Sequence, residues 1–135
     1  APCSGSGTIN AKDDKLEKYF SKDLKNRSQK VQLELLKKAT TILKPNSEMV
    51  YSTCSILKEE NENNILKILS NKNIEIVPIN KEIFKEIPTL PVSIEGTVCV
   101  CPNELYEGFF IAKLRKKWKR CKNYYKNRKK CVNLI

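Results

Sequence analysis

The sequence contains no histidine, and this absence excludes two kinds of site within the chain. A cysteine activated by a histidine cannot form, and neither can a metal site that uses imidazole ligands. The restriction matters because the chain has six cysteines. Any cysteine that acts as a nucleophile must therefore be activated by backbone dipoles, by nearby Lys or Arg residues, or by its substrate.

Long hydrophobic runs are also missing from the sequence. No apolar stretch approaches the roughly 20 residues that a membrane helix needs, and the start, APCSGSGTIN, lacks the basic and apolar blocks of a signal peptide. With 40% hydrophobic and 30% charged residues, the 135-residue chain is typical of one small soluble domain. We therefore expect a cytoplasmic protein with reduced thiols and no membrane partner. The chain opens at Ala1 on a loop-like segment, which we interpret as part of something longer.

Acidic residues are absent from residues 113–135. This segment holds 11 of the 26 Lys and Arg residues, and all 15 acidic residues precede it, so it carries the whole net charge of +11. Such a tail suits a phosphate backbone, and Trp118, Tyr124 and Tyr125 could stack on bases. A solvated, lysine-rich end without a partner is the alternative. The candidate RNA-binding residues are Lys116, Lys117, Lys119, Arg120, Lys122, Arg128, Lys129 and Lys130.

The hydrophobic pattern predicts an α/β order of elements. These are a helix at 24–43, a buried strand at 49–56, a helix at 59–71, and strands at 74–79, 97–101 and 108–114. The first half alternates as βαβ units do, and the final strand is apolar enough to be central. We expect the C-terminal part of a doubly wound sheet, with its last strand inserted antiparallel at the end of a hairpin. Between the strands, Pro88 and Pro91 forbid a long element in residues 80–95.

The helix expected at residues 24–43 is amphipathic. Its predicted apolar face consists of Val31, Leu35, Leu36, Ala39 and Leu43. Gln32 sits beside this face. Asn46 follows the helix and can adopt the left-handed conformation that a turn requires. A short helical turn is also expected near residues 16–20.

Two cysteine motifs occupy positions where open α/β sheets place their chemistry. Cys54, in the string STCS, ends the strand at 49–56 and faces the next helix, whose exposed N–H groups favour a thiolate. Cys3 lies in the loop APCSGSG, where Gly5 and Gly7 permit close approach by a ligand. If each cysteine follows a parallel strand, both lie at one sheet edge and can serve one reaction. A plain surface turn and a buried strand cysteine are the alternatives.

The remaining cysteines and the acidic cluster have simpler interpretations. Cys99 and Cys101 share one face of a strand and are expected to be core thiols. A four-cysteine zinc site that adds Cys121 and Cys131 is the alternative, although a paired CxxC spacing is missing. The acidic residues expected to complement the dipole of the helix start are Glu59, Glu60 and Glu62.

Together these motifs resemble the Sun-type (Nop/Sun) RNA cytosine-5 methyltransferases. The matching strings are APCSGSGTI, QLELLKKA, LKPNSEMVYSTCSILKEENE and CPNELYEGFFIAKLRKK, in the order and spacing of that family. The resemblance implies the C-terminal part of a Rossmann-like class I methyltransferase sheet that uses S-adenosylmethionine. Residues 1–117 would be the C-terminal half of the catalytic domain, and residues 118–135 a basic tail. A non-catalytic RNA-binding module that acts through this tail is the alternative.

The resemblance also implies a mechanism with two cysteines. Cys54 would attack C6 of a cytosine, so that C5 can accept the methyl group, and Cys3 would assist proton removal from C5 or product release. DNA cytosine-5 methyltransferases instead use a cysteine in a Pro-Pro-Cys-Gln setting, whereas this chain has PCSG and an additional TC. The expected partner is RNA, ribosomal RNA first and tRNA second. No metal is expected, and the full-length form is expected to be monomeric.

Parts of the family's cofactor site are missing from this sequence. The acidic residue that precedes the Pro-Cys motif, the glycine-rich cofactor loop and the ribose-binding acid have no counterpart here. Only Ala1 and Pro2 are therefore expected at the edge of that site. We expect the chain alone to be inactive and to bind S-adenosylmethionine weakly or not at all.

Overall fold

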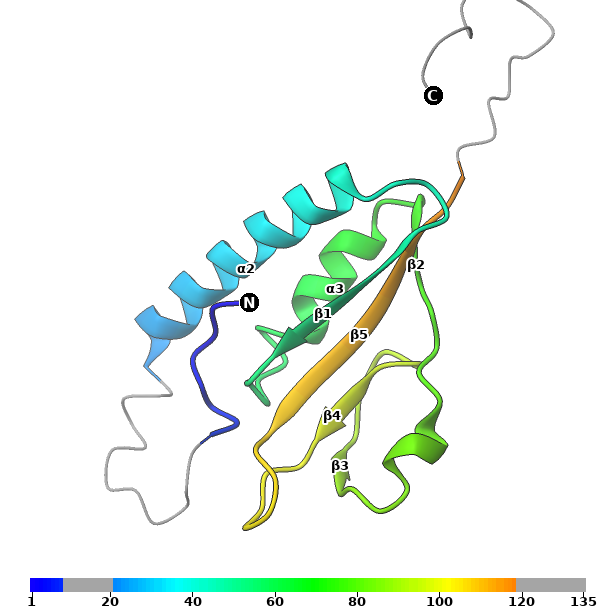
Figure 1. Ribbon diagram of the computed structural model, residues 1–135. Helices are drawn as coiled ribbons and strands as arrows, with labels where there is room; N and C mark the ends of the chain where they lie inside the picture. The colour runs from blue at the N-terminus through cyan, green and yellow to red at the C-terminus, as the bar shows by residue number, and fades with distance from the viewer. Residues whose placement is uncertain (9–20, 119–135) are drawn as a thin grey trace, which may run out of the picture.

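The computed structural model describes residues 1–8 and 21–118. Its elements in chain order are α2 (Lys22–Ile42), β1 (Glu48–Thr53), α3 (Glu62–Leu69), β2 (Ile74–Ile76), the 3-10 helix η1 (Lys81–Phe84), β3 (Thr89–Leu90), β4 (Val98–Val100) and β5 (Phe109–Lys116) (Figure 1). The predicted elements are present with shifted ends, and two short elements are added, η1 before Pro88 and β3 between Pro88 and Pro91. The helical turn expected near residues 16–20 lies outside the described residues. Of the helices that the structure describes, none is long and apolar enough to cross a membrane.

Strand β5 is the centre of the five-stranded sheet that the described residues form. β1 pairs with one edge of β5, in a register that places Glu48 opposite Arg115 and Thr53 opposite Phe110. β2 and β4 pair with the other edge, at opposite ends of β5, and β3 pairs with β4. The predicted central position of this strand and its antiparallel insertion are both confirmed.

Every pairing between the described strands is antiparallel, and β5 is inserted between the two strands of the βαβ unit. β1 and β2 both run opposite to β5, so they run parallel to each other with β5 between them (Figure 1). Helix α3 connects them as the crossover of a βαβ unit. The predicted βαβ order is therefore present, in a sheet whose described pairings are all antiparallel.

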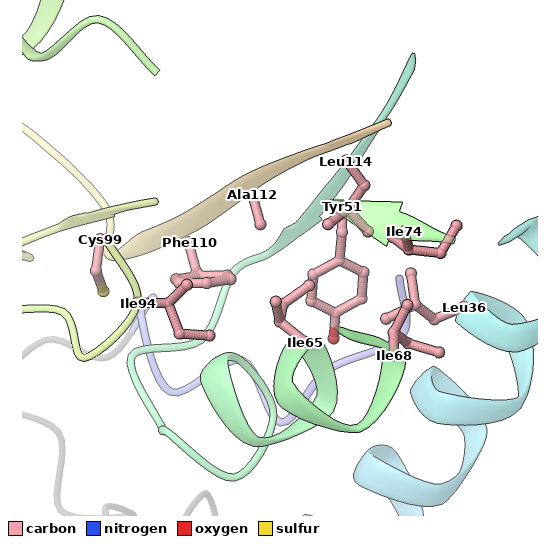
Figure 2. Packing of buried hydrophobic residues seen from close by; sticks show 10 residues of the cluster. All are labelled: Leu36, Tyr51, Ile65, Ile68, Ile74, Ile94, Cys99, Phe110, Ala112 and Leu114. Carbon is pink, nitrogen blue, oxygen red and sulfur yellow. The ribbon is translucent and has the colours of Figure 1, made fainter. Parts of the chain in front are cut away.

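Helices α2 and α3 cover one face of the sheet (Figure 1). Along β5, Phe110, Ala112 and Leu114 alternate with more exposed residues and are fully buried against these helices. Figure 2 shows Tyr51 beside Phe110, with an edge-to-face ring contact of 6.4 Å between centroids. Burying a side chain of this size contributes roughly 1.5–3 kcal/mol. The remaining members of the core cluster are Leu36, Ile65, Ile68, Ile74, Ile94 and Cys99.

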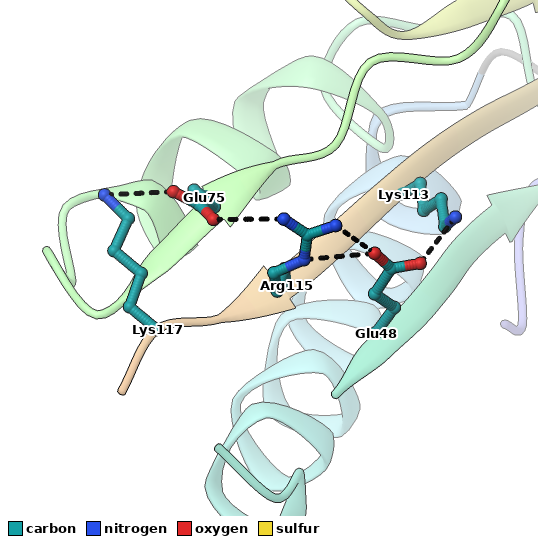
Figure 3. Close-up of polar contacts among 5 residues, drawn as sticks. All are labelled: Glu48, Glu75, Lys113, Arg115 and Lys117. Carbon is teal, nitrogen blue, oxygen red and sulfur yellow. Dashed lines mark hydrogen bonds and ion pairs between the residues drawn. The ribbon is translucent and has the colours of Figure 1, made fainter. Parts of the chain in front are cut away.

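The opposite face of β5 carries a ladder of charges across three strands (Figure 3). Glu48 on β1 pairs with Arg115 and, at 2.5 Å, with the Nζ atom of Lys113. Arg115 reaches Glu75 on β2 at 3.8 Å, and Lys117 reaches it at 3.3 Å. Hydrogen bonds from Lys113 and then from Arg115 lower the pKa of Glu48. Because these pairs are exposed to solvent, water and salt screen them and their contribution to stability is small.

Helix α2 turns a different face toward the core than the apolar pattern predicts. Val31 and Leu35 are 47% and 46% exposed, whereas Gln32 is completely buried. The buried residues of α2 are Ser28, Gln32, Leu36 and Thr40. The helix is rotated toward Gln32 because the amide of that side chain is hydrogen-bonded inside the molecule. The predicted turn after the helix is confirmed, since Asn46 has a φ of 62°.

Strand β1 is less buried than the predicted core strand. Val50 is 58% exposed, while Tyr51 and Thr53 on the other face are buried. This alternation is typical of a strand with one covered face, since β1 lies over the helices on that side only. Among the described residues, β5 is the one strand that pairs with β1, so the other edge of β1 has no strand beside it. Its carboxyl end leads directly into the loop that carries Cys54.

Candidate active site

The structure brings Cys3 and Cys54 together. Cys54 directly follows β1, and Cys3 lies in the N-terminal segment that runs between α2 and β1 (Figure 1). Their Cα atoms are 6.4 Å apart, and the two loops place their sulfur atoms within bonding reach of each other. The prediction that both cysteines lie at one sheet edge is confirmed. Reduced thiols at this pair stay a prediction.

Backbone hydrogen bonds fix the N-terminal loop between two other loops. The amide of Gly7 donates to the carbonyl of Cys54 at 3.0 Å, and the amide of Gly108 donates to the carbonyl of Gly7 at 2.7 Å. A Cβ atom on Gly7 would lie 2.0 Å from the carbonyl oxygen of Gly108. Gly7 is therefore needed because two backbones meet at this position. The sequence had instead suggested that a ligand approaches the backbone there. Gly5, with a φ of 75°, supplies the turn that precedes it.

Two serine hydroxyls join the cysteine loops. The Oγ atoms of Ser6 and Ser55 lie 2.8 Å apart, and both residues are buried. Ser6 Oγ also accepts from the amide of Ile56 at 3.2 Å. These contacts connect the loop of Cys3 to the residues just after Cys54. The two loops thus form one hydrogen-bonded unit.

Asn61 binds the residues on both sides of Cys54. Its Oδ1 accepts from the Thr53 hydroxyl at 2.5 Å, and its Nδ2 donates to the Ser55 carbonyl at 2.8 Å. Asn61 is completely buried at the N-cap position of α3. The helix begins at Glu62, several residues after Cys54, so an effect of its dipole on the Cys54 thiol stays a prediction.

Glu60 and Gln32 bind the residues on both sides of Cys3. The Glu60 carboxylate accepts from the Ser4 amide at 2.9 Å and from the Ser4 hydroxyl at 2.6 Å. Gln32 Nε2 donates to the Pro2 carbonyl at 2.7 Å and to Glu60 at 3.2 Å. The expectation that Glu60 lies at the helix start to complement its dipole is not met, because Glu60 precedes the N-cap residue and its carboxylate is buried against Ser4. Of that cluster, Glu62 alone lies in the first turn of α3, and Glu59 is exposed in the preceding turn.

The sequence held one signal for this polar cluster. Gln32 interrupts an apolar helical pattern, and a buried amide requires partners. Asn64 is one of them, because its Nδ2 donates to Gln32 Oε1 at 3.1 Å. Tyr51 closes the cluster from β1, with its hydroxyl donating to the Glu60 carbonyl at 2.6 Å. Burial raises the pKa of Tyr51 to about 12.

Ala1 and Pro2, the residues expected at the edge of a cofactor site, lie beside β1. The Ala1 amino group donates to the Ser52 carbonyl at 3.2 Å. Ala1 also lines a groove of about 210 Å³ between α2 and β1, together with Leu35 and Val50. Nothing in this geometry tests cofactor binding, so both assignments stay predictions. A larger cavity, of about 510 Å³, lies away from the cysteine pair, beside β3 and β4.

The candidate RNA-binding residues are only partly within the described chain. Lys116 Nζ donates to the carbonyls of Thr40 and Thr41, each at 2.9 Å, and so caps the end of α2. Lys117 pairs with Glu75. Both cations therefore have partners within the fold, and their contact with RNA stays a prediction. The residues outside the described chain are Lys119, Arg120, Lys122, Arg128, Lys129 and Lys130.

Of the other four cysteines, two lie within the described residues and two lie outside them. Cys99 is buried in β4, as expected, and burial raises the pKa of its thiol to about 11. Cys101 is half-buried just beyond that strand. Cys121 and Cys131 lie outside the described residues. Within residues 1–8 and 21–118, no three side chains of the metal-binding types converge on one point.

Solved structures share the fold of the described residues. A methyltransferase homologue from Pyrococcus horikoshii is 34% identical, with a TM-score of 0.66 over 86% of this chain and 37% of its own. NSun6 from Pyrococcus horikoshii, solved with SFG, is 28% identical, with a TM-score of 0.67 over 86% of this chain and 28% of its own. The described fold therefore corresponds to one part of larger methyltransferase structures.

Sequence relatives lead to the same family. The ribosomal RNA small subunit methyltransferase F of Klebsiella pneumoniae (strain 342) is 36% identical over 86% of this chain. The enzyme of the same name from Escherichia coli O9:H4 (strain HS) is 37% identical over the same share. The chain spans 24% of the length of each relative. The family described as 16S rRNA methyltransferase RsmB/F matches residues 1–115. This chain therefore belongs to the RsmB/F (Nop/Sun) family of RNA methyltransferases.

Proposed function

We propose that this chain carries the two-cysteine catalytic part of an enzyme that methylates C5 of a cytosine in RNA, with ribosomal RNA as the substrate. The observation that supports the proposal most strongly is the meeting of Cys3 and Cys54 at the end of β1. Relatives named as ribosomal RNA small subunit methyltransferases support the substrate class. The cytoplasmic location stays a prediction.

Each cysteine has a separate task in this proposal. Cys54 attacks C6 of the target cytosine as a thiolate, which makes C5 electron-rich. S-adenosylmethionine supplies the methyl group that C5 then accepts. Cys3 assists loss of the C5 proton, after which the bond between Cys54 and C6 breaks and the thiolate leaves. Both cysteines act as thiols or thiolates in these steps, so the reacting protein must have the pair in its reduced form.

Ala1 and Pro2 would lie at the edge of the cofactor site. They are suited to this position because the N-terminal segment is held against β1 by the bond from Ala1 to Ser52. The remaining contacts to the cofactor would come from residues with no counterpart in this sequence. Residues 1–117 would therefore supply the cysteines, with residues 118–135 as a basic extension.

Covalent trapping on RNA tests the assignment of Cys54. Full-length protein incubated with RNA that contains 5-azacytidine should form an adduct that survives denaturing electrophoresis, and Cys54→Ser should abolish it. Cys3→Ser should still form the adduct, because Cys3 acts after attack on C6. An adduct that persists in Cys54→Ser would refute the assignment of Cys54 as the nucleophile. An adduct that disappears only in Cys3→Ser would assign that role to Cys3 instead.

A second candidate is a non-catalytic RNA-binding module that acts through the basic tail. The concentration of 11 Lys and Arg residues and no acidic residue in residues 113–135 favours it. RNA affinity should then fall, and its salt dependence should weaken, when residues 118–135 are deleted. Unchanged affinity on deletion would rule out the tail as the binding element. Methyl transfer and tail binding are compatible, and Cys54→Ser separates them because it leaves the tail intact.

A further inference from the structure

Glu60 is a buried carboxylate whose hydrogen-bonding capacity is directed at one loop. It is completely buried and accepts three hydrogen bonds, two from Ser4 and one from Gln32. Among the described residues, no Lys or Arg forms a salt bridge with it. A carboxylate buried in this way costs free energy unless its hydrogen bonds are satisfied. The three donors therefore determine where the loop must lie.

These bonds constrain Cys3 from both sides. Gln32 holds the carbonyl of Pro2, and Glu60 holds the amide and hydroxyl of Ser4. Gln32 and Glu60 are bonded to each other, so the two restraints act as one. Gln32 is itself fixed on α2 and bonded to Asn64 of α3. The position of Cys3 is thus set by both helices.

The neighbouring residue, Asn61, constrains Cys54 in the same manner. Its amide binds Thr53 before the cysteine and Ser55 after it. Because Glu60 and Asn61 are adjacent in the chain, two successive side chains reach the two cysteine loops. The peptide bond between Glu60 and Asn61 therefore links the hydrogen bonds that hold the Cys3 loop to those that hold the Cys54 loop.

We infer that Glu60 and Asn61 are positioning residues that set the separation of Cys3 and Cys54, Glu60 together with Gln32 by holding Pro2 and Ser4, and Asn61 by holding Thr53 and Ser55. The inference rests on the proposed function for its purpose, because a reaction with two cysteines needs both sulfurs at one cytosine. Its geometry stands on the contacts alone. Neither side chain is assigned a contact with substrate.

The effective concentration of one thiol toward the other measures this positioning. The reduced 135-residue chain is equilibrated with glutathione and glutathione disulfide at several ratios and then quenched with acid. One cysteine thiolate displaces glutathione to form a mixed disulfide, and the second displaces the other glutathione, so glutathione disulfide takes up both electrons. Peptide mapping quantifies the Cys3–Cys54 disulfide separately from the other cysteines. Because each protein disulfide releases two glutathione molecules, the square of the glutathione concentration divided by the concentration of glutathione disulfide, taken at half-oxidation, gives the effective concentration.

The variants are chosen to separate positioning from stability. Glu60→Ala and Asn61→Ala should each lower the effective concentration by about tenfold or more, because each releases one cysteine loop. Glu60→Gln should retain it within about threefold, since the amide oxygen can still accept and the amide nitrogen can donate to the Ser4 hydroxyl. Ser4→Ala, which removes one hydroxyl bond, is the milder variant if Glu60→Ala fails to fold, and it should lower the value by about threefold.

Glu62→Ala is the matched control. Glu62 is 4% exposed and accepts from the Ser93 amide at 3.4 Å, with no hydrogen bond to either cysteine loop. It should reduce stability in urea yet leave the effective concentration unchanged. If Glu60→Ala and Asn61→Ala behave like Glu62→Ala, or if Glu60→Gln loses as much as Glu60→Ala, the inference is overturned. The assay contains no RNA, so its failure and a failed RNA adduct are separate results.

Discussion

Replacing Gly7 with alanine should separate the loop of Cys3 from the hairpin that leads into β5. A Cβ atom at this position would lie 2.0 Å from the Gly108 carbonyl oxygen. Carbon and oxygen atoms in close contact normally stay about 3.3 Å apart. One of the two backbones must therefore move by more than about 1 Å. Neither can move as a flexible side chain would, because the clash involves main-chain atoms of both loops.

The size of the effect follows from the two hydrogen bonds made by Gly7. Its amide bonds to Cys54 and its carbonyl to Gly108, at 3.0 and 2.7 Å. At about 0.5–1.5 kcal/mol for each bond, losing both should lower the free energy of unfolding by about 2 kcal/mol. With a slope of about 1–3 kcal/mol per molar urea, the midpoint of urea denaturation should fall by about 1 M.

Gly5→Ala is the control for this prediction. Gly5 has a φ of 75°, but the nearest atom to an added Cβ is Thr8 Oγ1 at 3.6 Å, so the side chain has room. Its cost should be limited to the left-handed backbone, about 1–2 kcal/mol, with the Gly7 contacts intact. The effective concentration of Cys3 toward Cys54 should consequently fall in Gly7→Ala and not in Gly5→Ala. Equal effects of the two substitutions on that concentration would refute the reasoning.

Three further predictions concern the core, the charge ladder and the cofactor. Phe110→Ala should lower the free energy of unfolding by about 3–5 kcal/mol, because it empties the centre of the core next to Tyr51, and a loss below about 1 kcal/mol in urea denaturation would contradict that packing. The pKa of Glu48 is lowered in the fold by Lys113 and Arg115, so its contribution is present above its ordinary value of 4.5 and is lost as the pH falls through the lowered value. Glu48→Gln should thus destabilise the protein at neutral pH more than in strong acid, and equal losses in urea denaturation at both would argue against the ladder. Calorimetric titration of the chain alone with S-adenosylmethionine should show weak binding or none, and micromolar binding would contradict this expectation.

The central strand could be predicted from the sequence because it is a nearly continuous apolar run, which is typical of a strand inside a sheet. The string GFFIAKL predicts a strand, and three alternating residues of β5 are fully buried. Which strands would be neighbours could not be predicted in the same way. Pairing is a competition between distant segments, so the sequence predicted an inserted last strand but not the register in which β1, β2 and β4 share its two edges.

The cysteine pair could also be predicted, since each cysteine sits in a loop motif at the same edge of an α/β sheet. The side chains that hold the pair could not. Hydrophobic periodicity assigned Val31 and Leu35 to the buried face of α2, although Gln32 takes that place. Gln32 is buried because Pro2 and Glu60, far away in the sequence, supply its hydrogen bonds. A pattern that reads one helix at a time contains no information about such partners.

The core therefore has two parts with different physical origins. Under β5, burial of Phe110 and Leu114 stabilises the fold through apolar area and tolerates small shifts. Around the cysteine loops, Glu60, Asn61 and Gln32 are buried just as completely, but their hydrogen bonds are directional and fail when a loop moves by about 1 Å. Burying polar groups is a poor way to gain stability, because desolvation offsets much of each bond. The polar part of the core is better explained by the geometry that it imposes on two cysteines than by the stability that it adds.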